Sequence, residues 1–257
     1  MVIAAAVCPW PPALAAELTG PDAAIEQLRD ACAQAVERLV RNRPELVAVI
    51  GPAQVTRTWP ADSRLDMSVF APALGRTGGR AGDPALPPSL GIGALLLDQA
   101  GYPGPGCRVL QAVAEDEPPA ACAELGAEIA GSSRRVGLLV MADGSARRSP
   151  RAPGHLDPRA AAFDAETERA LRQADFGTLL DMSPGMASEL MATGRPAWQV
   201  LAGALRQATA TADVLYSDAP FGVGYLVAYL EPAGEPTAAH PPPPAQPAPA
   251  PGRGASR

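Results

Sequence analysis

Seven residues at or after the ends of predicted strands carry side chains that could do chemistry. They are Cys8, Trp10, Gln54, Asp143, Ser145, His155 and Asp218. Thiolate, imidazole and carboxylate groups are metal ligands, so Cys8, His155 and Asp218 form a metal set on paper. Ser145 would be a nucleophile only if a base lay within hydrogen-bond reach, and His155 is the residue that could serve.

Three of these side chains also have a structural interpretation. Cys8 ends an apolar run and is expected to be a buried thiol. Asp143 could organise its own loop by accepting backbone N–H groups, and a single loop histidine such as His155 is usually solvated. Arg147 and Arg148 could attract an anionic ligand, although adjacent arginines on a loop are usually only solvated.

The composition excludes several kinds of chemistry. All 21 basic residues are arginine, which removes Schiff-base lysine catalysis and a P-loop lysine. The sequence has no G-x-G-x-x-G after its first predicted strand and no G-x-S-x-G nucleophile elbow. Its two histidines are too far apart in the chain for an HEXXH zinc motif.

The arginine bias, together with 30 prolines and abundant alanine, is typical of a GC-rich genome of actinobacterial type.

Charge and hydropathy place the chain in a broad class. Its net charge of -6 gives no electrostatic basis for binding nucleic acid or an anionic membrane. No apolar stretch reaches the roughly 18 residues that a membrane span needs. The four cysteines show no C-x-x-C spacing and are expected to be reduced. We therefore expect a cytoplasmic protein that binds neither nucleic acid nor membrane.

Alternating strand and helix patterns predict one α/β domain over residues 1–231, with a central, largely parallel or mixed sheet flanked by helices. Continuous apolar runs predict strands at Val2–Val7, Leu46–Ile50, Arg108–Val113, Arg135–Met141, Asp213–Tyr216 and Val223–Leu230. Helical spacing predicts helices at 21–44, Ser89–Ala100, Pro119–Ala130 and Pro158–Ala174, and two or three shorter ones in 176–210. Residues 53–88 are expected to form a long irregular excursion with one weak strand candidate, Met67–Phe70, and 232–257 a disordered Pro/Ala-rich tail.

Four segments, taken in order, resemble the LigB-like superfamily of class III extradiol ring-cleavage dioxygenases and their Memo-like relatives. AAAVCPWPPAL resembles the family's strand and Pro-His-Pro-Pro turn, and VAVIGPAQ a strand ending in Gly/Ser-Pro-His. LLVMADGSARRSPRAPGHLDPRAAAFD resembles a strand with a Gly-Asp-x-Ser-His-Arg loop, and YSDAPFGVGYLVAYL resembles the Glu-x-Pro-Phe-Gly-Val-Gly-Tyr ending. The resemblance spans nearly all of residues 1–231.

The resemblance implies a ferrous ion on two histidines and one carboxylate, with open positions for a catechol-type substrate and O₂, and a separate acid/base histidine. On this chain the metal positions fall at Trp10, Ala53 and Asp218, and the acid/base position at Ala146. An indole N–H is only a donor, and alanine has no ligand atom. We therefore expect a degenerate iron site, with no metal and no other cofactor.

These observations favour a LigB-like protein that is non-catalytic or repurposed for small-molecule binding or protein interaction. The seven residues named first would line the pocket, and Trp10 offers a flat face on which a small aromatic ligand could stack. The alternative is an active non-heme-iron, ring-cleaving oxidoreductase with a remodelled metal site that holds Fe²⁺. A metal-independent hydrolase built on Ser145 is a third interpretation.

A homodimer through apolar surface in 176–210 is also compatible with the sequence, although packing inside the domain explains those residues equally well.

Overall fold

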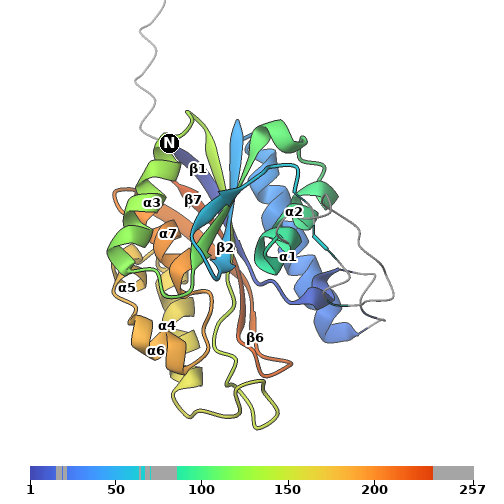
Figure 1. Ribbon diagram of the computed structural model, residues 1–257, viewed down its shortest axis with the longest axis vertical. Coiled ribbons are helices and arrows are strands. Elements are labelled where there is room, and N and C mark those ends of the chain that lie inside the picture. Colours follow the sequence, from blue (N-terminus) through green and yellow to red (C-terminus); the bar gives the residue numbers. More distant parts are fainter. Residues whose placement is uncertain (16–18, 20–21, 64, 67–69, 71–85, 234–257) are drawn as a thin grey trace, which may run out of the picture.

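The computed structural model describes residues 1–15, 19, 22–63, 65–66, 70 and 86–233. These residues build one seven-stranded sheet with the strand order β3-β4-β2-β5-β1-β7-β6 (Figure 1). The strands are β1 (Val2–Cys8), β2 (Leu46–Ala53), β3 (Arg57–Trp59), β4 (Arg108–Ala114), β5 (Val136–Met141), β6 (Ala210–Asp218) and β7 (Tyr225–Pro232).

The centre of the sheet is parallel and both margins are antiparallel. Strands β4, β2, β5 and β1 run in one direction, and in this register Val7 of β1 faces Val140 of β5. Strand β7 pairs antiparallel with β1 and β6, and β3 pairs antiparallel with β4. The expected α/β class with a mixed, largely parallel sheet flanked by helices is thereby confirmed.

Helices cover both faces of the sheet (Figure 1). On one face lie α1 (Ala23–Arg41) and α2 (Pro88–Gln99), whose apolar residues share a core with Ala4, Ala6 and Cys8 of β1. The opposite core takes Ala5 and Val7 together with residues of α3 (Pro119–Gly131), α4 (Ala160–Arg172), α5 (Phe176–Leu180) and α7 (Arg195–Leu205). Because side chains alternate along a strand, one apolar run supplies both cores. A two-turn helix, α6 (Pro184–Glu189), precedes α7.

Local signals account for the first helix. The carboxylate of Asp22 accepts the backbone N–H groups of Ala24 and Ile25 at 2.9 and 3.3 Å, as an N-cap residue does. Buried residues then recur at helical spacing, and Cys32 lies fully buried in the middle of this stripe. The predicted helix therefore forms where its cap and apolar periodicity place it.

Helices α3 and α7 cross at two glycines. A Cβ on Gly126 would lie 2.1 Å from the carbonyl oxygen of Val200, and one on Gly203 would lie 2.4 Å from that of Ala123. Any larger residue at either position would push the helices apart. Since α7 also contacts β2, β4 and β5, this crossing fixes how the rest of the face packs on the sheet.

Several boundaries differ from expectation. The excursion expected at 53–88 contains a short edge strand, β3, and β2 extends to Ala53. By contrast, segment 176–210 forms α5, α6 and α7, as the expected two or three short helices. Of the strand candidate Met67–Phe70 only Phe70 is described, in a turn, and all but two residues of the expected tail lie outside the described residues. None of the helices described is both long enough and apolar enough to cross a bilayer.

Candidate functional site

The carboxyl ends of the four parallel strands meet at one edge of the sheet. After β1 the chain passes to α1 on one face, whereas after β5 it passes to α4 on the opposite face. Adjacent strands whose following segments leave toward opposite faces open a crevice between them, and ligands of such sheets bind there. The site is therefore sought where β1 and β5 end, at Cys8–Trp10 and in the loop that begins with Ala142.

Asp143 joins three chain segments at this point. Its Oδ1 accepts the backbone N–H of Trp10 at 2.9 Å, and its backbone forms an isolated antiparallel bridge with Tyr225. Its carbonyl oxygen accepts the N–H of Gly194 at 3.0 Å. A Cβ on Gly194 would lie 2.5 Å from that same oxygen, so this approach requires glycine. Asp143 thus holds the turn after β1 rather than its own loop.

The surroundings of this carboxyl group change its acidity. Burial raises the pKa of Asp143 to about 7, and the hydrogen bond from Trp10 opposes this only in part. Burial, a hydrogen bond with Cys8 and the charge of Asp143 together raise the pKa of the Cys32 thiol well above its usual value. Burial and then the charge of Asp143 raise the pKa of Tyr225 as well.

A second tyrosine completes the group. Burial is the main cause of the raised pKa of Tyr216, followed by the charges of Asp218 and Cys32. Tyr216 and Trp10 are partly buried against the core that contains Cys8, Cys32 and Tyr225. We refer to these residues as the Asp143 cluster, which consists of Cys8, Trp10, Cys32, Asp143, Tyr216 and Tyr225.

The Asp143 cluster combines a carboxyl group that titrates near neutral pH with three aromatic side chains. Such a carboxyl group can accept a hydrogen bond when ionised and donate one when protonated. The indole Nε1 of Trp10 is buried and has no acceptor among the described residues. The cluster therefore combines aromatic side chains, a donor and a proton-exchanging group.

Of the seven sequence candidates, Cys8, Trp10 and Asp143 come together here. Gln54, His155 and Asp218 are exposed. The Asp218 carboxylate accepts the N–H of its neighbour Ala219 at 2.7 Å. Its backbone lies two strand spacings from Asp143, because Asp218 pairs with Tyr225 and Tyr225 with Asp143; this separation is roughly 10 Å.

The backbone of His155 is left-handed, with a φ of 57°, and the side chain lies on the outer loop. Nowhere in the described part of the chain do three or more His, Cys, Asp or Glu side chains gather so that they could hold a metal ion. Cys8, His155 and Asp218 accordingly do not converge. The positions of the implied iron ligands hold a donor-only indole, a methyl group and an exposed carboxylate, and these residues do not fit a ferrous ion. At the implied acid/base position, Ala146 has no group that can exchange a proton.

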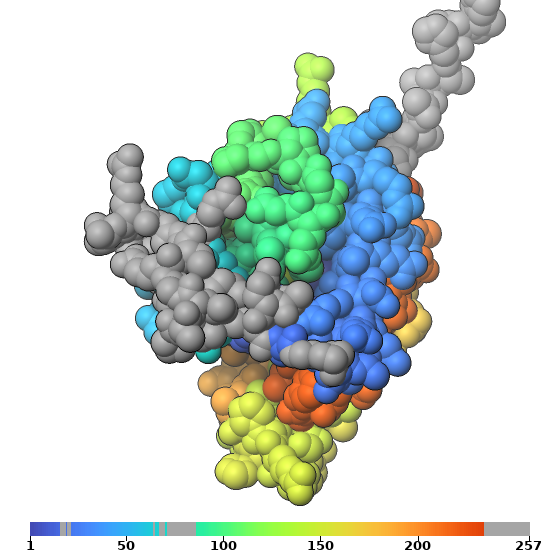
Figure 2. Space-filling model, turned by 90° about the vertical axis from the view of Figure 1, so that its right-hand side faces the viewer, coloured from blue at the N-terminus to red at the C-terminus, as the bar shows by residue number. Residues whose placement is uncertain are grey.

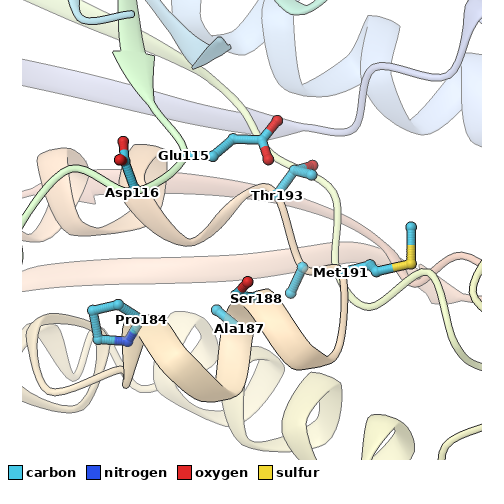
Figure 3. A pocket seen from close by; sticks show the side chains of 8 residues that line it. Glu115, Asp116, Pro184, Ala187, Ser188, Met191 and Thr193 are labelled. Carbon is cyan, nitrogen blue, oxygen red and sulfur yellow. The ribbon is translucent and has the colours of Figure 1, made fainter. Parts of the chain in front are cut away.

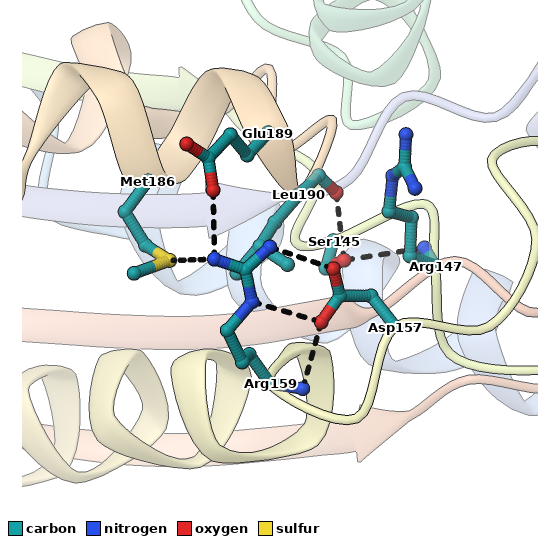
Figure 4. A network of polar contacts seen from close by, with 7 residues as sticks. All are labelled: Ser145, Arg147, Asp157, Arg159, Met186, Glu189 and Leu190. Carbon is teal, nitrogen blue, oxygen red and sulfur yellow. Dashed lines mark hydrogen bonds and ion pairs between the residues drawn. The ribbon is translucent and has the colours of Figure 1, made fainter.

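Ser145 has a structural role. It is fully buried, its Oγ donates to the carbonyl oxygen of Leu190 at 2.7 Å, and the same atom accepts the N–H of Arg147 at 3.2 Å (Figure 4). A serine nucleophile needs a base as partner, whereas both of these hydrogen bonds join the hydroxyl to main-chain groups. A second contact with α6 is the ion pair of Arg159 with Glu189, in which Arg159 Nη1 lies 2.7 Å from Glu189 Oε2 (Figure 4).

Sequence reasoning missed Asp164, the residue that organises the loop after β5. Its carboxylate is buried, and it accepts the Ser145 N–H at 2.8 Å and pairs with Arg148 at 2.7 Å. Cβ atoms on Gly144 or Gly224 would collide with it, at 2.6 and 2.1 Å. The available signal was a carboxylate on the buried stripe of a helix, because Ala160, Asp164, Thr167 and Leu171 follow helical spacing.

Cys32, Tyr216 and Tyr225 were missed as well. Each of them lies in a segment that was predicted correctly as a helix or a strand. No local pattern, however, shows that Cys32 of the helix and the two tyrosines of the strands come together near Asp143. The tyrosines flank the SDAPFG turn, and this flanking position is the one signal the sequence provides.

A cavity of about 390 Å³ lies at the same edge of the sheet, next to α6 (Figure 3). Thr193 lines this cavity, and the next residue, Gly194, packs on the backbone of Asp143. None of the seven sequence candidates lines it. Its lining residues are Glu115, Asp116, Pro184, Ala187, Ser188, Met191, Ala192 and Thr193.

Comparison with known proteins bears on the fold. No model of a known protein family matches the chain, and no curated protein matches it. Among solved structures, the chain is similar to the crystal structure of an uncharacterized protein, JW3007, from Escherichia coli K12, at 15% identity and a TM-score of 0.52. The match covers 89% of this chain and 99% of that one. At this identity the likeness establishes a shared α/β fold.

Proposed function

We propose that this chain is a LigB-like domain with a degenerate iron site, and that it binds a small aromatic molecule at the Asp143 cluster without cleaving it. The observation that carries the proposal is the hydrogen bond from the Trp10 backbone to Asp143 at the carboxyl ends of the parallel strands, with Tyr225 close to Asp143 and Tyr216 close to Tyr225. The family name itself rests on the sequence resemblance.

The chemistry of the Asp143 cluster favours a ring that bears a hydroxyl group. Tyrosine and tryptophan rings contact an aromatic ligand through offset or edge-to-face packing, worth about 0.5–1.5 kcal/mol per pair beyond buried area. A phenolic hydroxyl would donate to the ionised Asp143 carboxylate, or accept from its protonated form. The Trp10 indole N–H, which has no acceptor in the described part of the chain, would donate to a second ligand oxygen.

The lack of suitable ligand atoms supports binding without oxygen chemistry. A ferrous site of this family type needs two imidazoles and a carboxylate that reach one point. Here Trp10 and Ala53 stand where the imidazoles would be, and Asp218 is exposed on the edge strand β6. In this proposal Asp143 assists no metal ion, and its role is to bind the hydroxyl group of the ligand.

Binding is tested by isothermal titration calorimetry with catechol and, as a control, trans-1,2-cyclohexanediol, which keeps the vicinal hydroxyl groups but has no ring. We expect catechol to bind and the diol not to bind. Asp143→Ala should abolish catechol binding, while the exposed carboxyl variant Asp218→Asn should bind like wild type. Equal binding of the two diols, or unchanged catechol binding by Asp143→Ala, contradicts the proposal.

The alternative function, an active ring-cleaving oxidoreductase, gives a different result in the same preparation. The purified protein would then contain stoichiometric iron that is lost in Asp218→Ala, and it would take up oxygen when catechol is added. These two results together would support the ring-cleaving function and contradict binding without cleavage. We expect no oxygen uptake, whether or not ferrous ion is added.

A further inference from the structure

The cavity next to α6 has two carboxylates on its wall. Glu115 and Asp116 follow β4, and neither carboxylate has an ion pair or hydrogen bond to another side chain within the described residues. Partial burial and then the charge of Asp116 raise the pKa of Glu115, as expected for a carboxylate without a cation. The buried guanidinium of Arg195 interacts electrostatically with Asp116, but within the described residues it forms no ion pair with either carboxylate. Its Nη1 and Nη2 donate to the main-chain carbonyls of Glu117 and Glu115.

The loop after β5 carries the opposite charge. Residues Ser149–Ala152 form a turn closed by the Ala152 N–H donating to the Ser149 carbonyl at 3.0 Å, and Arg151 occupies the third position of this turn. Pro150 and Pro153 flank the arginine and restrict the backbone. Arg151 is exposed and pairs with no carboxylate of the described chain. In Figure 2 this yellow-green segment projects from the lower end of the molecule.

The loop and the cavity are neighbours on one surface. A Cβ on Gly154 would lie 2.5 Å from the Sδ of Met191, and Met191 lines the cavity. Two large apolar side chains of this surface are exposed, with Leu156 at 55% and Met191 at 40%. A projecting cation, an acidic cavity and exposed apolar groups thus lie side by side at the carboxyl edge of the sheet.

We propose that a second copy of this chain docks here, so that the Arg151 loop of each protomer enters the Glu115–Asp116 cavity of the other. A two-fold axis between the loop and the cavity brings both contacts together at once, because an isologous interface uses the same patch twice. The ion pairs set the orientation, and burial of Leu156 and Met191 adds the apolar contribution that exposed ion pairs alone do not supply.

The size of the effect follows from this symmetry. A partly exposed ion pair at the favourable end of measured pairs strengthens an association by a factor of about three to five. Each dimer contains the contact twice, so the factor is squared to about 10–25. Replacing Arg151 by alanine should therefore raise the dimer dissociation constant about 10–25-fold, and Arg151→Glu should raise it further by adding repulsion.

The test uses analytical ultracentrifugation of the full chain and a charge exchange. Wild type is expected to dimerise in the micromolar range and to dissociate as salt is raised. Arg151→Glu and Asp116→Arg should each be monomeric alone, while an equimolar mixture of the two should dimerise. In that heterodimer both contacts pair opposite charges. Arg206→Glu, at the far end of α7 from the cavity and exposed, is the matched control and should dimerise like wild type.

Each outcome decides the proposal. A monomeric wild type at 200 μM, a dimer unaffected by Arg151→Ala, or a mixture that stays monomeric overturns it. The far-ultraviolet circular dichroism and melting temperature of each variant show whether it is folded. Arg151 and Asp116 both lie on exposed loops, so their replacement should leave the fold intact.

Discussion

Replacing Asp143 by asparagine should stabilise the protein at alkaline pH and have little effect at acidic pH. The amide oxygen of asparagine can still accept the Trp10 N–H that Asp143 Oδ1 accepts at 2.9 Å. What disappears is the cost of keeping a negative charge in a buried position beside Cys8, Cys32 and Tyr225. The substitution therefore separates the charge of Asp143 from its hydrogen bond.

The magnitude follows from the pKa of this group. The gap between about 7 in the folded protein and the ordinary 3.8 corresponds to about 4 kcal/mol at 1.36 kcal/mol per pKa unit. Between these two values the folded protein keeps the proton and the unfolded chain releases it. The free energy of unfolding of the wild type thus falls as pH rises from about 4 to 7 and is lower by this amount above pH 7. Local relaxation reduces the penalty, and we expect Asp143→Asn to gain about 2–4 kcal/mol at pH 8.

Urea denaturation followed by circular dichroism at pH 4.5, 6, 7 and 8 measures this difference. The stability of Asp143→Asn relative to wild type should rise across the series, whereas that of the control Asp218→Asn should stay small throughout. Asp143→Ala, which also removes the acceptor for Trp10, should be less stable than Asp143→Asn at every pH. A stability difference between Asp143→Asn and wild type that does not change with pH would refute the assigned burial of this charge.

Three further changes test the packing and the loop, each by urea denaturation. Gly126→Ala should cost about 1–3 kcal/mol by forcing a methyl group against the Val200 carbonyl oxygen, 2.1 Å away, while Gly131→Ala in the same helix, with open space around it, should be neutral or slightly stabilising. Equal effects at the two glycines would contradict the close helix crossing. Ser145→Ala should cost about 1–3 kcal/mol, because a buried carbonyl loses its donor, and no loss would contradict that bond. Asp164→Ala should cost about 3–5 kcal/mol by leaving the Arg148 guanidinium and a buried N–H without an acceptor; a loss below 1 kcal/mol would show that the loop is held by other contacts.

The sequence alone was sufficient to predict which segments form most of the strands and helices. Val2–Val7 and Leu46–Ile50 read as buried strands because continuous apolar runs suit a strand covered on both faces. Helix α1 followed from its Asp22 cap and its apolar stripe. These signals are local, within a few residues of one another, and so they can be read before the chain is folded.

Strand β3 shows where local signals fail. Three residues are too few to show a recognisable alternation of apolar and polar side chains. The strand exists because Arg57, Thr58 and Trp59 pair with β4, which lies about fifty residues further along the chain.

For the site, the sequence could indicate that Trp10, Ala53 and Ala146 supply no iron ligand or proton-exchanging group, because that depends only on the atoms in each side chain.

Which candidates meet was decided by the tertiary structure alone. Asp143 and Trp10 are brought into contact because β1 and β5 are neighbours in the sheet, although 133 residues separate them along the chain. The same folding leaves His155 and Asp218 exposed and places Cys32 and Tyr225 close to the buried carboxyl group. Residue types are fixed by covalent structure, but proximity, burial and the resulting shift in acidity arise only when distant segments pack together.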